Sequence, residues 1–120
     1  MEIKIRQKGR VIILDLCGRL DADAAELVEI VGQCVRDGIT DICCDFDAVD
    51  LIDYIGISAL VLAYKEVVNH QGRMKIARIP THLKGIFCVT GLDHTLDIYP
   101  SLEAALESFS QDAAIEKIQK

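Results

Sequence analysis

The apolar run "VIILDLCG", residues 11–18, most constrains how this 120-residue chain can fold. A strand that is apolar at almost every position is buried on both of its faces, which places it in the middle of a sheet. Further strands are predicted in "IKI" (3–5), "ITDICCDF" (39–46), "RMKIARI" (73–79) and "LDIYP" (96–100). The run therefore predicts a multi-stranded sheet with this segment inside it.

Four helical patterns alternate with these strands, over residues 21–38, 56–70, 80–92 and 101–110. In the first, Asp21 or Asp23 is a candidate N-cap and Gly38 suits the left-handed residue that ends a helix. Thr81 and Ser101 are the candidate caps of the last two. The alternation indicates an α/β domain with at least part of its sheet parallel. No internal boundary appears, so we expect one domain over 1–120 with a C-terminal extension at 111–120.

The composition and charge of the chain exclude some classes of function. Hydrophobic residues make up 51% and aromatic residues 5%, so the core is aliphatic. The net charge of −6 supplies no basic stripe for nucleic acid. No apolar run is long enough to cross a bilayer, and the start "MEIKIRQKGR" lacks the apolar centre of a signal peptide. We therefore expect a cytoplasmic protein that does not insert directly into a membrane.

Five cysteines and three histidines could suggest a metal site or a disulfide framework. No C-x-x-C is present, and the histidines do not lie at metal-ligand spacing from the cysteines. Most of the cysteines sit inside apolar runs, which favours buried, reduced thiols. We expect neither a metal nor a cofactor.

An acidic cluster, Asp45, Asp47, Asp50 and Asp53, runs into the second helix in "DFDAVDLIDYIG". It lacks the glycine and distal glutamate of a calcium loop, and no Gly-x-Ser-x-Gly elbow or phosphate-binding glycine loop accompanies it. The acidic pair that receiver domains carry after their first strand is also missing from "EIKIRQKG". Asp53 is best explained as the N-cap of the second helix, and an enzyme is not expected.

The order of "VIILDLCGRLD", "ITDICCDFDAVDLIDYIGISAL" and "RMKIARIPTHLKGIFCVTGLDHTLDIYPSLEAAL" resembles the STAS domain of anti-sigma factor antagonists, over about residues 11–106. The resemblance implies a STAS-like mixed β-sheet of about five strands, with about four helices packed mainly on one face. It also implies a binding module that sequesters a serine-kinase-type anti-sigma factor, or a related ATPase-fold protein, and so regulates transcription.

The family's switch is a Ser or Thr that directly follows the motif aspartate, commonly in Asp-Ser-Ser-Gly. Here Tyr54 and Ile55 stand between Asp53 and Gly56, so the resemblance carries no phosphoacceptor over to this chain. Ser58 lies two residues beyond the glycine, outside the acceptor position. We therefore expect a module that is not switched by phosphorylation at this motif.

At helical spacing, one face of the second helix is assigned to the core: Ile57, Leu60, Val61, Tyr64 and Val68. The opposite side carries Ile55, Ala59, Leu62 and Glu66, flanked by Ser58 and Lys65, and is apolar where a surface helix is usually charged. We expect the partner to bind Asp53, Tyr54, Ile55, Gly56, Ser58, Ala59 and Leu62. The C-terminal segment 111–120, or a second copy in a homodimer, could cover this face instead.

Two other functions remain open. STAS domains also accompany transporters, so the chain could be an accessory subunit of a membrane transport or signalling complex. It could also be a small-ligand or nucleotide sensor.

Overall fold

The computed structural model describes residues 1–119, with side chains to residue 118, so Lys120 of the predicted extension lies outside the described residues. The strands are β1 (Glu2–Lys8), β2 (Val11–Leu20), β3 (Asp41–Ile52), β4 (Arg73–Ala77) and β5 (Asp97–Tyr99). The helices are α1 (Ala25–Arg36), α2 (Tyr54–Asn69), α3 (Lys84–Val89), α4 (Leu92–Thr95) and α5 (Leu102–Gln119), with 3₁₀ turns η1 (Ala22–Ala24) and η2 (Thr81–Leu83).

The five strands form one sheet in the order β1-β2-β3-β4-β5. β1 pairs with β2 antiparallel through a turn at Gly9, whose φ of 61° is left-handed. The other pairs, β2–β3, β3–β4 and β4–β5, are parallel. The predicted mixed sheet is therefore confirmed, and the "VIILDLCG" segment lies inside it, between β1 and β3.

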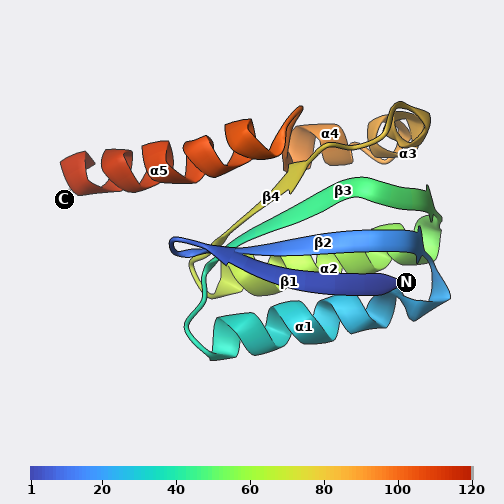
Figure 1. Ribbon diagram of the computed structural model, residues 1–120, viewed down its shortest axis with the longest axis horizontal. Coiled ribbons are helices and arrows are strands. Elements are labelled where there is room, and N and C mark those ends of the chain that lie inside the picture. The colour runs from blue at the N-terminus through green and yellow to red at the C-terminus, as the bar shows by residue number, and fades with distance from the viewer. Residues whose placement is uncertain (120) are drawn as a thin grey trace.

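Helices lie on both sides of this sheet, because its inner strands are apolar on both faces. Ile12 and Leu14 of β2 point into the larger core cluster, together with residues of α1 and α2. Val11 and Ile13 point the other way, into a smaller cluster that Ala105 and Phe109 of α5 complete. Figure 1 shows α1 and α2 together below the sheet and α5 above it.

The helix boundaries follow local signals. Gly38, predicted as the left-handed residue that ends the first helix, has a φ of 85° and lies two residues after Arg36, the last residue of α1. Ser101 Oγ accepts a hydrogen bond from the backbone N–H of Ala104 at 3.1 Å, as predicted. The caps predicted at Asp21 or Asp23 and at Thr81 are wrong, because 3₁₀ turns precede α1 and α3 and use no side-chain cap. The helix predicted over 80–92 is divided by Gly91, whose φ of 74° interrupts α-helical geometry.

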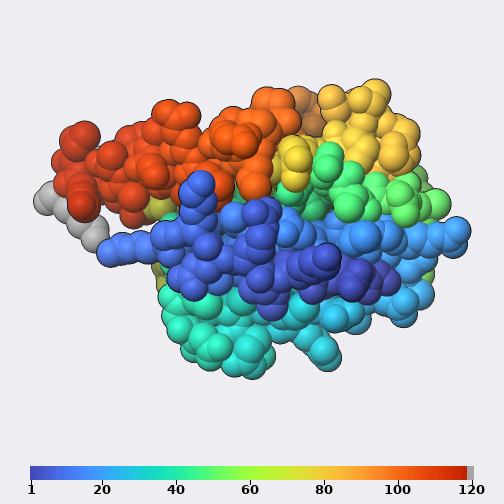
Figure 2. Space-filling model, viewed as in Figure 1, coloured from blue at the N-terminus to red at the C-terminus, as the bar shows by residue number. Residues whose placement is uncertain are grey.

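The predicted extension continues α5 without a break through residue 119. Its last turns reach beyond the end of the sheet, where Figure 2 shows them at the end of the molecule opposite the η2–α3 region. Asp112 and Glu116 of this segment contact Arg73 on β4. The segment therefore lies on the α5 side of the sheet, not over the second helix.

Candidate functional site

The junction between β3 and α2 is built around Asp53. Its backbone is extended (φ −110°, ψ −174°), and its Oδ1 accepts a hydrogen bond from the backbone N–H of Gly56 at 2.9 Å. Its own N–H donates to the carbonyl of Leu20 at 3.3 Å, which ties the helix start to the end of β2. The predicted N-cap is therefore confirmed.

Gly56 is the second fixed point of the junction. A Cβ at this position would lie 1.9 Å from the carbonyl oxygen of Leu20 and 2.7 Å from its carbonyl carbon. A backbone carbonyl cannot move aside as a flexible side chain can, so the site requires glycine. The spacing Asp-x-x-Gly thus has two structural causes: the aspartate caps the helix, and the glycine lets it approach β2.

Two residues between these anchors point into solvent. Tyr54 is 68% exposed and Ile55 59% exposed, on the first turn of α2. Leu62 is 56% exposed two turns further on, and Leu51 at the end of β3 is 43% exposed. Leu51 was not among the residues predicted to bind a partner. Its signal was the "DLID" pattern, in which one of two adjacent apolar residues of a strand must face outward.

Ser58 is exposed and its hydroxyl donates to the carbonyl of Tyr54 at 2.9 Å, within the same helix. Ala59, predicted on the binding face, is 6% exposed, because its small side chain lies at the floor between α1 and α2. One core assignment on α2 is wrong. Val68, predicted in the core, is 46% exposed because the buried stripe continues through Ala63 and Val67.

A groove runs between α1 and α2 on the outer side of the two-helix layer. Its walls are formed by Ala22, Ala25, Val28, Glu29, Gly32 and Arg36 with Ile55, Ala59, Leu62 and Glu66. Ile55 and Leu62 of the predicted binding face border it, and Ala59 lies at its floor. The groove therefore joins the exposed start of α2 to the surface of α1.

The acidic residues before Asp53 do not converge. Asp45 is buried and accepts two hydrogen bonds from Arg78, at 3.1 and 2.5 Å, while Asp47 and Asp50 are exposed. Within residues 1–118, no three acidic, histidine or cysteine side chains gather as metal ligands. Asp45 is therefore part of an ion pair on the sheet, which accounts for one member of the cluster without a ligand.

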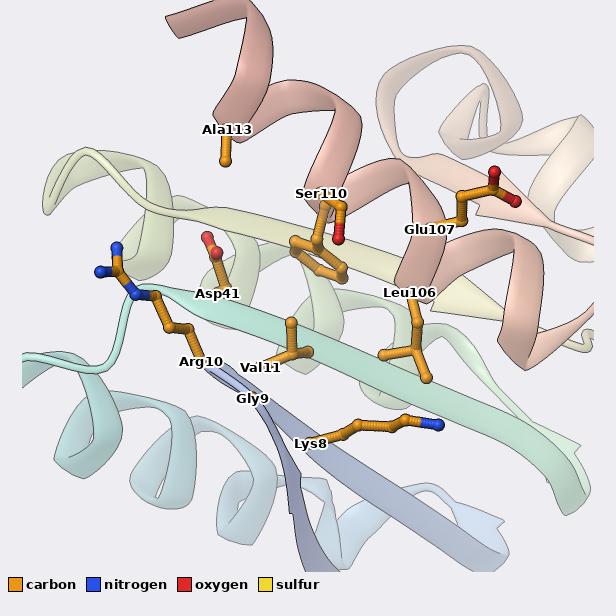
Figure 3. Close-up of a pocket in the computed structure, with 10 residues that line it drawn as sticks. Lys8, Gly9, Arg10, Val11, Asp41, Leu106, Glu107, Ser110 and Ala113 are labelled. Carbon is orange, nitrogen blue, oxygen red and sulfur yellow. The ribbon is translucent and has the colours of Figure 1, made fainter. Parts of the chain in front are cut away.

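A separate hollow lies at the other end of the molecule, between the β1–β2 turn and α5 (Figure 3). Val11, Leu106 and Phe109 form its apolar part, and Lys8 and Arg10 reach it from either side of the turn. Asp41 also borders it, and partial burial raises the pKa of this carboxyl, although Arg73 acts in the opposite direction. This hollow shares no residue with the junction around Asp53.

Comparison with known proteins fits this geometry. The model of the STAS domain matches residues 2–105, and the chain belongs to that family. None of the helices in the described part of the chain is long and apolar enough to span a membrane.

Three solved structures illustrate the similarity. An anti-sigma factor antagonist from Mycobacterium paratuberculosis is 23% identical, with a TM-score of 0.79 over 89% of this chain and 92% of that one. Protein TM1081 of Thermotoga maritima is 20% identical, with a TM-score of 0.81 over 88% and 92%. A sulfate transporter family protein from Wolinella succinogenes is 17% identical, with a TM-score of 0.74 over 82% and 84%. At these identities the likeness shows the shared fold.

Proposed function

We propose that this protein is a binding module of the anti-sigma factor antagonist type, which captures an ATPase-fold anti-sigma factor through the start of α2. One observation carries the proposal: the rigid junction at Asp53 and Gly56 holds two large apolar side chains, Tyr54 and Ile55, in solvent. Exposed apolar groups on a rigid support lose little conformational entropy on binding, which makes them suited to be interface anchors.

Tyr54 and Ile55 also occupy the positions where the family has its phosphoacceptor Ser or Thr. Ile55 has no hydroxyl, and the phenol of Tyr54 extends several ångströms further than a serine hydroxyl, out of line with a serine-directed phosphoryl donor. Ser58 is displaced by one helical turn and its hydroxyl already donates to a backbone carbonyl. Binding through this surface would therefore be constitutive, without catalysis and without phosphorylation at the motif.

The test combines binding and phosphorylation with the anti-sigma factor encoded nearest to this gene. We expect calorimetry to give a 1:1 complex, and Ile55→Ala to weaken it by roughly tenfold or more. Ile118→Ala is the matched control, since Ile118 is 84% exposed at the far end of α5. Equal effects of the two variants, or no complex at all, would reject the proposed surface.

Mass spectrometry after incubation with the same partner and ATP tests the absence of the switch. We expect no stoichiometric phosphate on Tyr54. Phosphate on Tyr54 would reject the constitutive module, and phosphate on Ser58 would show that the acceptor has moved by one turn. Binding to a transporter ATPase in place of the anti-sigma factor would move the protein to the transport accessory class.

A further inference from the structure

The groove between α1 and α2 has the periodicity of a helix-packing seam. On α1 and the turn before it, all the lining residues except Val28, which lies next to Glu29, recur at steps of three and four: Ala22, Ala25, Glu29, Gly32 and Arg36. On α2 they recur at steps of four, three and four: Ile55, Ala59, Leu62 and Glu66. Residues spaced in this way form one straight stripe on each helix, and two such stripes side by side present a surface onto which a third helix packs.

Side-chain size varies across this seam in a regular way. The floor is made of small groups, Gly32 and Ala59, both buried, with the exposed Ala25 beside them. Ile55 and Leu62 rise at the α2 side and are more than half exposed. Small residues beside this wall leave room for the leucine or isoleucine side chains of an approaching helix, except over Gly32, where the guanidinium of Arg36 lies.

Charge around the groove is mostly negative. Glu29 and Glu66 line it, and Asp23 and Glu26 are exposed at the start of α1. One cation, Arg36, also lines the groove, but its guanidinium bonds to Gln33 at 3.2 Å and lies against Gly32. Glu66 is 3.9 Å from the ring of His70, an exposed and weak contact. The groove thus suits a segment with positively charged flanks.

We infer that this groove binds an amphipathic helix that carries an apolar stripe at three- and four-residue spacing, flanked by Lys and Arg. The inference rests on the proposed function, because it names the part of the partner that a binding module of this kind would hold. Tyr54 and Ile55 then mark one end of the contact and Glu66 marks the other, with Glu29 midway along α1.

Two 18-residue model peptides test the inference on the intact protein, without any assumption about the natural partner. Both carry the same leucine stripe in an alanine background, and their flanks are lysine in one and glutamate in the other. By amide NMR titration we expect the lysine peptide to perturb residues of η1, α1 and α2. We expect the glutamate peptide to bind roughly tenfold more weakly.

Variants separate groove binding from general attraction to an acidic protein. Glu66→Lys should weaken binding of the lysine peptide roughly fivefold. Glu107→Lys makes the same charge change on the exposed side of α5 and should leave binding of this peptide unchanged. Ala25→Arg should abolish binding, since it fills the groove from an exposed position. Equal losses for Glu66→Lys and Glu107→Lys, or perturbations outside η1, α1 and α2, would overturn the inference.

A second copy of this chain is an alternative occupant, since α5 ends in exposed Ile115 and Ile118. Light scattering at rising protein concentration decides this, and a dimer broken by Ala25→Arg would overturn the assignment to a partner helix. The two proposals fail separately. If the lysine peptide does not bind the groove, this does not reject anti-sigma factor binding at Tyr54 and Ile55. If no complex forms with the anti-sigma factor, this does not reject peptide binding in the groove.

Discussion

Lys75 of β4 and Asp112 of α5 form an ion pair at 2.5 Å, across 37 positions of the chain. Lys75 is 1% exposed, although the sheet face around it is apolar. Its ammonium also donates to Ser108 Oγ at 2.7 Å and lies 4.8 Å from the ring centre of Phe109. This lysine therefore attaches the middle of α5 to the sheet, and the helix supplies most of its partners.

The two members of this pair should differ in how their loss affects stability. Asp112→Ala leaves a buried ammonium with Ser108 and a distant Asp97 at 3.7 Å, and we expect a loss of about 2–4 kcal/mol. Lys75→Met removes the buried charge and keeps an apolar chain of similar length, while Asp112 stays about one-third exposed and hydrated. We expect a change within about 1 kcal/mol.

Urea denaturation of the two variants measures this difference, and Glu107→Ala on the exposed side of α5 serves as the control. If Lys75→Met is the more destabilising of the two, the ion pair contributes net stability, and its attraction exceeds the free energy lost by removing the two charges from water.

This buried lysine also shows where the sequence was insufficient. A strand was predicted in "RMKIARI", and the structure confirms it, but nothing in that segment indicates that a helix begun 27 residues after Lys75 buries this lysine. Local signals did predict the Asp53 cap and the Ser101 cap. They depend on neighbours within four residues.

The candidate site shows the same division. The exposure of Ile55 and Leu62 follows from helical periodicity and was predicted. The burial of Ala59 and the groove beside it were not, because they depend on how closely α1 approaches α2. That approach depends on residues of two different helices, which no pattern within one helix reveals.

The cysteines should divide into two classes toward a thiol reagent. Cys17 and Cys88 are exposed, whereas Cys34, Cys43 and Cys44 are buried. The prediction of buried thiols is thus wrong for Cys17 and Cys88. Burial raises the pKa of all three buried thiols, that of Cys43 to about 12. At pH 8 we expect two thiols to react at once and three at the rate of unfolding.

The raised pKa values of the buried thiols make the stability of the fold depend on pH. Above pH about 8.5 the thiols ionise in the unfolded chain, while in the fold they stay protonated. Their contribution to stability is therefore complete below that pH and is lost as the pH rises toward about 12. Urea denaturation at pH 7.5 and at pH 10 should show that the free energy of unfolding falls less between these two pH values for Cys43→Ala than for the parent. An equal loss in both would mean that other groups cause it.

Substitutions at Asp53 show whether this residue acts as a hydrogen-bonding N-cap or through its negative charge. We expect Asp53→Ala to cost about 1 kcal/mol, because the N–H of Gly56 loses its acceptor. Asp53→Ser and Asp53→Asn keep a side-chain oxygen that can accept this hydrogen bond, and they should cost much less. Chemical denaturation compares the three. Equal losses would show that the negative charge itself is required, as a metal or partner contact would demand.

Two glycines should respond to alanine in opposite ways. Gly56→Ala places a methyl group against the backbone carbonyl of Leu20, and we expect a loss of about 3 kcal/mol or more. Gly32→Ala meets only the flexible guanidinium of Arg36, at 3.2 Å, and should stabilise α1 by up to about 1 kcal/mol. Melting temperatures of both variants test this. A destabilised Gly32→Ala would mean that the floor of the groove cannot accept a methyl group.

Two leucines two positions apart on α2 give the sharpest test of the binding surface. Leu60 is fully buried in the larger core, and Leu60→Lys should unfold the protein, since an unpaired ammonium there costs more than about 4 kcal/mol. Leu62 is 56% exposed at the edge of the α1–α2 groove, so Leu62→Lys should keep the native circular dichroism spectrum and thermal transition. It should nevertheless weaken partner binding roughly tenfold, because it places a cation where we expect the partner to bring its own. Leu62→Ala, which removes the apolar contact without a charge, should lie between the parent and Leu62→Lys. If Leu62→Lys is as unfolded as Leu60→Lys, this side of α2 belongs to the core. If it is folded and binds as tightly as the parent, the partner docks elsewhere.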